Sequence, residues 1–130
     1  MAFVLKQSDT YVWPVSFDIP TDGGRFIKQT FDAEFKRPTQ TRIVEIQESV
    51  MQRLRAIQND EETIGMITDL EIAGEILVGW AGIEDGKGGE VPYSEKAKDQ
   101  VLDMPAVSAS VVEAFFDSLK GAKKKPNRGG

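Results

Sequence analysis

The chain has 130 residues, which is enough for one domain with a hydrophobic core of its own. It contains no cysteine and no histidine, so disulfide bonds and thiolate chemistry are excluded, and the commonest general base and metal ligand is missing. Acidic residues outnumber basic ones and give a net charge of −5, so we expect the protein not to bind nucleic acid.

Apolar residues alternate with polar ones near the amino terminus. Every second residue is apolar over residues 11–19, which is the pattern of a strand with one buried face. Pro14 has no N–H to donate, so this strand should lie at a sheet edge or carry a bulge. The segment PTDGG, residues 20–24, supplies turn residues, and a second alternation follows over residues 25–35. Together these segments predict a long antiparallel hairpin.

Two segments after the hairpin show helical periodicity. In the first, apolar residues recur at steps of three and four over residues 43–57, and Thr39 or Thr41 is the expected N-cap. The second helix should run from about residue 61 to about residue 78, with acidic residues at its start, where the helix dipole favours them. Its expected apolar stripe consists of Ile64, Ile67, Leu70 and Leu77.

Two further helices are expected near the carboxyl end. Ser94 is the expected N-cap of a short helix that ends near Met104. A last helix should cover residues 106–120, with Gly121 directly after it. The final residues, 123–130, are basic and contain no acid, which is typical of a disordered, flexible tail.

The expected elements define an α+β fold. An N-terminal antiparallel β-hairpin at about residues 10–36 is joined to a small body of about four α-helices at about residues 39–120. We expect residues 1–122 to form a single domain and residues 123–130 to be its flexible basic tail. No apolar stretch reaches the roughly 20 residues that cross a bilayer, so we expect no membrane partner.

The glycine-rich segment 79–94, GWAGIEDGKGGEVPYS, matches phosphate-binding loops only in part. Three residues separate Gly82 from Gly86, where the Walker motif has four, and another glycine follows Lys87. The dinucleotide pattern fails too, because it requires a strand before the glycines and a helix directly after them. We therefore interpret the segment as a connector that binds no nucleotide.

No residue pattern indicates catalysis. Adjacent acids occur at Glu61-Glu62 and at Glu84-Asp85, but neighbouring acids in a sequence are usually a solvated helix start or loop. We expect a protein that is not an enzyme, with no catalytic, cofactor-binding or metal-binding residues and no cofactor.

Several short motifs resemble those of the tail assembly chaperones of long-tailed bacteriophages and prophages. The most specific are Trp13-Pro14-Val15, Asp22-Gly23-Gly24, Phe31 with Phe35-Lys36-Arg37, Gly79-Trp80, and Val91-Pro92-Tyr93-Ser94. The resemblance covers nearly the whole chain. It implies a non-enzymatic factor in the host cell cytoplasm that binds the tape measure protein, keeps its helices from aggregating and helps to recruit tail tube subunits. Such a factor is absent from the mature virion.

The resemblance also implies that the protein is made in two lengths by a programmed ribosomal frameshift near the end of the first reading frame. Three consecutive lysines, Lys123 to Lys125, can be encoded by an adenine-rich run on which such a slip would occur. An ordinary solubilising basic tail is the alternative explanation of these residues.

The apolar face of the hairpin is the expected interaction surface. Two strands alone are marginally stable in water, so this face must pack on the helical body, on a second copy in a homo-oligomer, or on a partner. The candidate partner-binding residues are Tyr11, Trp13, Val15, Phe17, Phe31 and Phe35. A virion structural protein, such as a tail tube or head-completion subunit, is the alternative function, because a long hairpin can also be a ring-forming arm.

Overall fold

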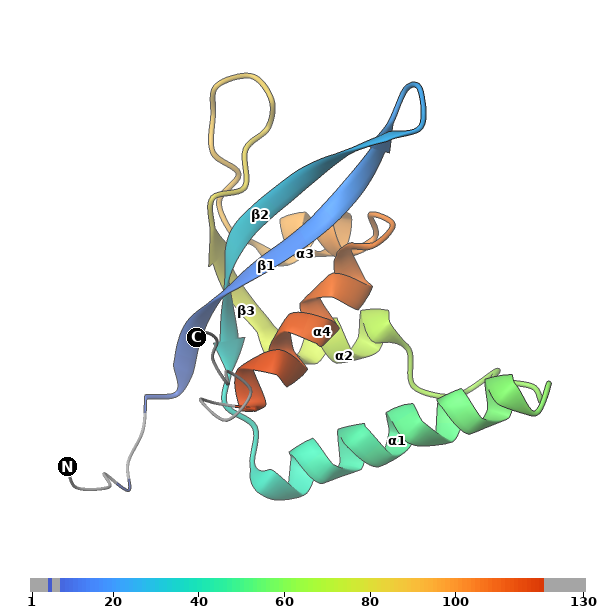
Figure 1. Cartoon of the computed structure of the whole chain (residues 1–130). Coiled ribbons are helices and arrows are strands. Elements are labelled where there is room, and N and C mark those ends of the chain that lie inside the picture. Colours follow the sequence, from blue (N-terminus) through green and yellow to red (C-terminus); the bar gives the residue numbers. More distant parts are fainter. Residues whose placement is uncertain (1–4, 6–7, 121–130) are drawn as a thin grey trace, which may run out of the picture.

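The structure is a computed structural model that describes residues 5 and 8–120. These residues fold into the elements β1 (Thr10–Thr21), β2 (Arg25–Lys36), α1 (Gln40–Gln58), α2 (Asp69–Ile76), β3 (Leu77–Ala81), α3 (Glu95–Leu102) and α4 (Val107–Leu119). The strands form one antiparallel sheet in the order β1-β2-β3. Helices α2 and α4 pack on one face of this sheet, and α1 lies below them in Figure 1. The fold is therefore α+β, as the sequence predicts.

Strands β1 and β2 form the hairpin that the alternating pattern predicts. The 12 residues of each strand pair in continuous register, without a bulge. In the turn, Gly23 and Gly24 have φ angles of 80° and 77°, which glycine adopts without the steric cost that a Cβ brings. β1 forms an edge of the sheet, so Pro14 occupies the kind of position that its missing N–H requires.

The predicted helix over residues 61–78 is wrong in its extent. Residues 61–68 form a loop, and α2 begins only at Asp69. The reason is a capping box at Thr68, whose hydroxyl accepts the N–H of Glu71 at 3.1 Å while a Glu71 carboxylate oxygen accepts the N–H of Thr68 at 2.9 Å. These two bonds satisfy backbone donors at a helix start and fix it there.

The carboxyl end of the same segment is a strand that sequence analysis does not predict. β3 follows α2 directly and pairs with the second half of β2. Leu77 is fully buried, and a side chain at Gly79 would collide with the carboxylate of Glu34 on β2. Of the expected stripe, Ile64 and Leu70 are instead 85% and 49% exposed. The apolar run is thus divided between a short helix and a strand.

The ends of the other helices agree with the sequence patterns. Thr39 is the N-cap of α1, and Ser94 caps α3 by accepting the N–H of Ala97 at 3.1 Å. Helix α4 buries residues spaced by four, namely Val107, Val111 and Phe115. Gly121 and the basic tail at 123–130, including the expected frameshift site, lie outside the described residues.

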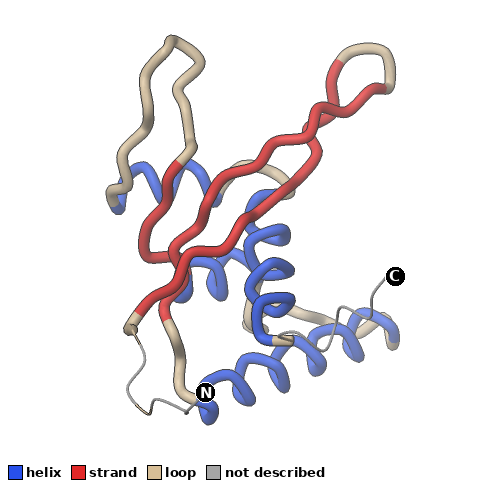
Figure 2. Tube along the Cα trace, turned by 60° about the vertical axis from the view of Figure 1, so that its left-hand side comes forward, coloured by secondary structure: helices blue, strands red, loops and turns tan. Residues whose placement is uncertain are grey.

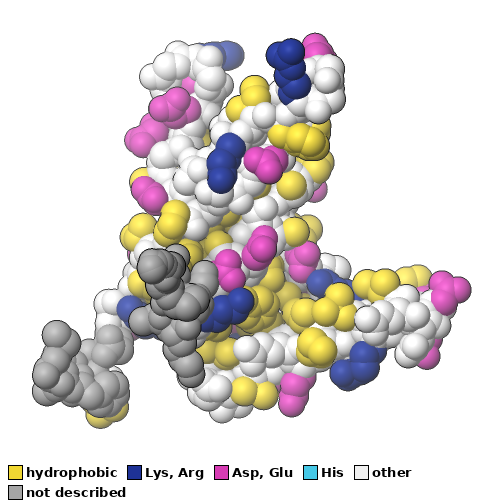
Figure 3. Space-filling model, viewed as in Figure 1, with side chains coloured by type: hydrophobic (Ala, Val, Ile, Leu, Met, Phe, Trp, Pro, Cys, Tyr) yellow, Lys and Arg dark blue, Asp and Glu magenta, His cyan; other side chains and the backbone are white. Residues whose placement is uncertain are grey.

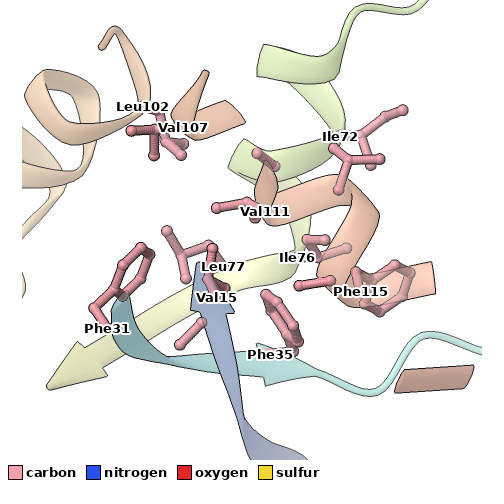
Figure 4. Packing of buried hydrophobic residues seen from close by; sticks show 14 of the residues in the cluster. Val15, Phe31, Phe35, Ile72, Ile76, Leu77, Leu102, Val107, Val111 and Phe115 are labelled. Carbon is pink, nitrogen blue, oxygen red and sulfur yellow. The ribbon is translucent and has the colours of Figure 1, made fainter. Parts of the chain in front are cut away.

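The core lies between the sheet and helices α2 and α4 (Figure 4). Phe35 of β2 and Phe115 of α4 are fully buried and meet edge to face, with 5.6 Å between their ring centroids. Val15 of β1, Ile76 of α2 and Leu77 of β3 are fully buried in the same cluster. One group of side chains therefore holds together all three strands and both helices.

Helix α1 is attached to this body by few buried side chains and by two arginines. Only Ile46 and Ala56 of its 19 residues are buried, and Ile46 belongs to the hydrophobic core. Arg42 donates from Nε and Nη2 to the two carboxylate oxygens of Glu75 on α2, at 2.9 and 2.7 Å. Arg53 donates to the carbonyl oxygen of Ile67 at 2.8 Å and to Asp69 at 2.9 Å. Ile46 and the two arginines thus hold α1 on the body, and much of its surface is left open.

Removing the Phe115 ring should unfold the protein more easily. We expect Phe115→Ala to lower the free energy of unfolding by about 3–5 kcal/mol, because it leaves a cavity against Phe35. Phe116 is half-buried beside it, so Phe116→Ala is a matched control that should cost clearly less. Urea denaturation followed by circular dichroism measures both, and equal losses would contradict this assignment of the core.

The attachment of α1 should weaken in acid. The hydrogen bonds from Arg42 hold the pKa of Glu75 below its ordinary value. A carboxylate with a lowered folded-state pKa stabilises the fold above its unfolded-state pKa, and this stabilisation is lost as the pH falls through the folded-state pKa. The loss should therefore begin below a pH of about 4.3, the ordinary pKa of a glutamate.

Thermal unfolding between neutral and acidic pH tests this expectation. Glu75→Gln should reduce stability near neutral pH and flatten the fall in acid. Glu45 also contacts Arg42, at 3.1 Å, but its side chain is 56% exposed, so Glu45→Gln should follow the wild-type profile closely. A Glu75→Gln profile that overlays the wild type would show that this ion pair does not hold α1.

Candidate partner-binding surface

The hairpin extends beyond the rest of the sheet. β3 pairs with β2 only over Asp32–Phe35, so in the described part of the chain no strand pairs with residues 25–31 of β2 on the edge away from β1. Residues 20–30, called the hairpin tip below, are all exposed. Figures 1 and 2 show from two directions that the tip points away from the helices. It offers a free strand edge, whose backbone groups another extended segment can pair with.

Two large apolar side chains at the tip are open to solvent. Phe26 is 67% exposed and Ile27 is 51% exposed. They lie on opposite faces of the hairpin, because successive residues of a strand alternate in direction. Apolar side chains grouped on a projecting part of a protein are typical of a protein–protein contact. The tip therefore combines a backbone edge with apolar anchors.

A small apolar pocket lies beside the tip. Its volume is about 160 Å³, and Phe17 and Phe31 of the hairpin, Ile83, and Val101 and Met104 at the end of α3 contribute to its lining. Small-molecule sites usually have roughly 300–1,000 Å³. The pocket is therefore too small for a typical cofactor and suits an apolar side chain of a bound protein segment.

The free strand edge and the pocket adjoin each other. Gly82, the first residue after β3, lies against the backbone of Phe31, and from this point towards the turn no described strand pairs with the edge of β2 that faces away from β1. Gln29 and Thr30 of β2 also line the pocket. A segment paired with this part of β2 would direct alternate side chains towards the pocket, as in strand addition to a sheet edge.

The structure divides the six residues that the sequence predicts to bind a partner. Three lie in the hydrophobic core, namely Val15, Phe31 and Phe35. Three are half-buried and pack against that core, namely Tyr11, Trp13 and Phe17. Their role in binding stays a prediction, but in this conformation the side chains of the first three are largely covered by the protein itself.

The two ends of this group differ in their surroundings. The hydroxyl of Tyr11 lies 2.7 Å from the hydroxyl of Ser118 on α4, and the guanidinium of Arg37 lies over its ring at 4.7 Å from the centroid. Phe17 instead meets Phe31 edge to face at 6.4 Å and lines the pocket. Tyr11 therefore anchors the base of the hairpin, whereas Phe17 lies next to the surface that a partner can reach.

The exposed side chains of the tip are not identified by the sequence patterns. The alternation places Ile27 on the apolar face, but α4 does not extend to the tip, and this part of the face is uncovered (Figure 1). Phe26 interrupts the alternation. That interruption is the one sequence signal for a binding residue here, because a phenylalanine on the outer face of a strand contributes little to the core.

The glycine-rich loop is closed by its own side chains. Trp80 donates its indole N–H to the carbonyl oxygen of Val91 at 2.8 Å. Asp85 accepts the backbone N–H groups of Lys87 and Gly89 at 2.7 and 3.1 Å, and these bonds hold the pKa of Asp85 below its ordinary value. A carboxylate thus occupies the backbone donors that a phosphate would need. This arrangement agrees with a connector, and the absence of nucleotide binding stays a prediction.

The part of the chain that the structure describes shows no sign of a metal site or of a membrane-spanning helix. Within it, no group of three or more acidic side chains could hold a metal ion. None of the helices in residues 8–120 is long and apolar enough to cross a membrane. The hairpin tip and its pocket are therefore the surface that we consider further for function.

Known proteins give no direct guide to this surface. A scan against protein-family models, a search of curated proteins and a search of solved structures each give no match.

Changes at the tip should leave the fold intact. We expect Phe26→Ser and Ile27→Ser to change the free energy of unfolding by less than about 0.5 kcal/mol, because both side chains are largely exposed. Val15→Ser should cost more than about 2 kcal/mol, because it removes buried apolar volume and buries a hydroxyl. Urea denaturation of the three variants checks this, and a large loss at the tip would mean that the tip belongs to the folding core.

Proposed function

We propose that this protein is a tail assembly chaperone of a long-tailed bacteriophage or prophage. In this proposal it acts in the host cytoplasm, binds the tape measure protein, helps to recruit tail tube subunits and catalyses no reaction. The observation that carries the proposal is the projecting hairpin tip, with its free strand edge, exposed Phe26 and Ile27, and side-chain-sized pocket.

The resemblance to tail assembly chaperones supports this assignment through motifs that have defined places in the fold. Asp22-Gly23-Gly24 forms the turn of the tip, and Trp13-Pro14-Val15 lies in β1. Gly79-Trp80 lies in β3, next to the chain that leads to the pocket. These motifs thus lie in the hairpin or next to it, in the region that the proposal assigns to binding.

The chemistry of the tip suits temporary binding of an incompletely assembled protein. A tape measure chain that is not yet enclosed by the tail tube exposes apolar side chains and, where it is extended, unpaired backbone groups. The edge of β2 can pair with the backbone, and the pocket can take a side chain. Small interfaces are typical of transient complexes, so a contact limited to one strand edge and one pocket would allow release during tail assembly.

Co-expression tests the proposal. The tape measure protein is taken from the same genome, where a tube gene upstream and a very long gene downstream would identify the tail operon. We expect this chain to keep the tape measure protein soluble and to co-purify with it. Phe26→Ser combined with Ile27→Ser should reduce the recovered complex at least about tenfold, because hot-spot side chains contribute about 2 kcal/mol or more.

A matched variant separates the tip from general apolar exposure. Val12 is 64% exposed near the base of the hairpin, so Val12→Ser should leave the complex unchanged. An insoluble tape measure protein, or equal losses for Val12→Ser and the tip variant, would contradict the proposed site. Mass spectrometry of purified particles distinguishes the alternative function, because a tail tube or head-completion subunit would be present there in stoichiometric amounts.

A further inference from the structure

One side of α1 is apolar and uncovered. Val44, Met51, Leu54 and Ile57 are 37%, 51%, 44% and 58% exposed. Successive members of this group are seven, three and three residues apart. Steps of three residues, and of seven as the sum of three and four, place them on adjoining positions of the helix surface. Figure 3 shows hydrophobic side chains along the upper edge of α1, on the side that faces α4. The residues that attach α1, namely Ile46, Arg42 and Arg53, lie on another side of the helix, so this side is free to bind another chain.

The two halves of this surface have different shapes. On the N-terminal side of residue 52, α1 and the end of α4 border an apolar groove of about 420 Å³, which is lined by Gln47, Val50, Met51, Phe116, Leu119 and Lys120. The C-terminal half, which carries Leu54 and Ile57, extends past α4 in both Figures 1 and 2, and the loop before α2 contacts it through Arg53. One half is therefore a groove, and the other half presents the apolar side chains that would fill such a groove.

Charges border the same surface in a complementary way. Glu48 and Arg55 are three and four residues from Met51, so they lie along one side of the helix, two turns apart. Both side chains are exposed, and within the described residues neither forms an ion pair. An acidic group thus borders the groove half, and a basic group borders the protruding half.

We propose that two copies of this chain pair through α1, antiparallel and about a two-fold axis near residue 52. In this arrangement Met51 packs against Leu54 of the second copy, and Val50 against its Ile57. The protruding half of each helix enters the groove of the other, and Glu48 lies beside Arg55 of the second copy. Each contact forms twice, as a two-fold interface requires.

The occupant is a second copy because the surface is complementary to itself. When the second helix runs antiparallel, the groove of each copy faces the protruding half of the other. Glu48 of each copy then faces Arg55 of the other, so both ends of the interface are complementary. In a parallel pair, Glu48 would face Glu48, Arg55 would face Arg55, and both grooves would lie at the same end. Charge placement of this kind selects partner and orientation. The pairing uses no residue of the hairpin tip, so it does not depend on the proposed function.

Charge reversal tests the pairing in solution. Sedimentation of the wild-type chain should show a concentration-dependent dimer. We expect Glu48→Arg and Arg55→Glu, each alone, to weaken it about tenfold, because two attractive pairs become repulsive. An equimolar mixture of the two variants should dimerise again, because one variant then carries two basic groups at these positions and the other carries two acidic groups. The double variant Glu48→Arg/Arg55→Glu should also dimerise.

Two further variants complete the test. Leu54→Asp should abolish the dimer, while circular dichroism confirms that the helix content is unchanged. Glu62→Arg makes the same charge change in an exposed loop outside α1, and it should leave the dimer as in the wild type. A wild-type chain that stays monomeric at the highest soluble concentration would overturn the proposal. So would a dimer that neither reversal weakens, or a mixture of the two variants that does not re-form it.

Discussion

The packing of the sheet on α4 and α2, centred on the contact between Phe35 and Phe115, is the interaction on which the rest of the structure depends. A two-stranded hairpin alone would be marginal in water. Here its base is held by a third strand on one edge and by helices on one face. The support on the edge of β2 ends at Asp32, where β3 stops pairing, and α4 does not reach the turn of the hairpin (Figure 1). The tip is therefore carried by a rigid base without being part of the core.

The same core explains why α1 is available for binding. It is attached through the buried side chain of Ile46 and through Arg42 and Arg53, which bind groups on α2 and on the loop before it. Because only two residues of α1 are buried, much of its apolar surface is left over after the domain has folded. The hairpin tip and α1 lie at opposite ends of the molecule (Figure 1). Two copies joined through α1 would thus keep both tips free for a partner.

The sequence predicts local features better than those that depend on neighbours in space. Alternation, turn glycines and N-cap residues predict the hairpin and the starts of α1 and α3, because each signal acts within a few residues. The strand β3 is missed because its five residues follow a helix without a break, and periodicity cannot separate such a short apolar run from a helix end. Its strand conformation depends on the edge of β2, which is far earlier in the chain.

Exposure is harder still to predict from a pattern. Ile27 and Val15 occupy equivalent places in the alternation, yet one is at the tip and the other is in the core. Which of them is buried depends on the length and direction of α4. The same limit applies to α1. Its apolar stripe is typical of a core helix, but the rest of the domain buries only part of that stripe. The candidate binding residues thus lie where the apolar pattern of a helix or strand continues past the neighbouring elements that would bury it.

The two open surfaces differ in the partners that they can select. At the hairpin tip, recognition would use backbone groups and one small apolar pocket, which many sequences can satisfy. At α1, it would require a helix with apolar residues and charges in a fixed order, which few sequences satisfy. The tip therefore suits a long partner whose sequence changes along its length, and α1 suits one defined partner. Helix α1 of this chain itself carries apolar residues and charges in such an order. The proposed dimer would therefore present two tolerant binding sites, one at each hairpin tip, to a single long protein.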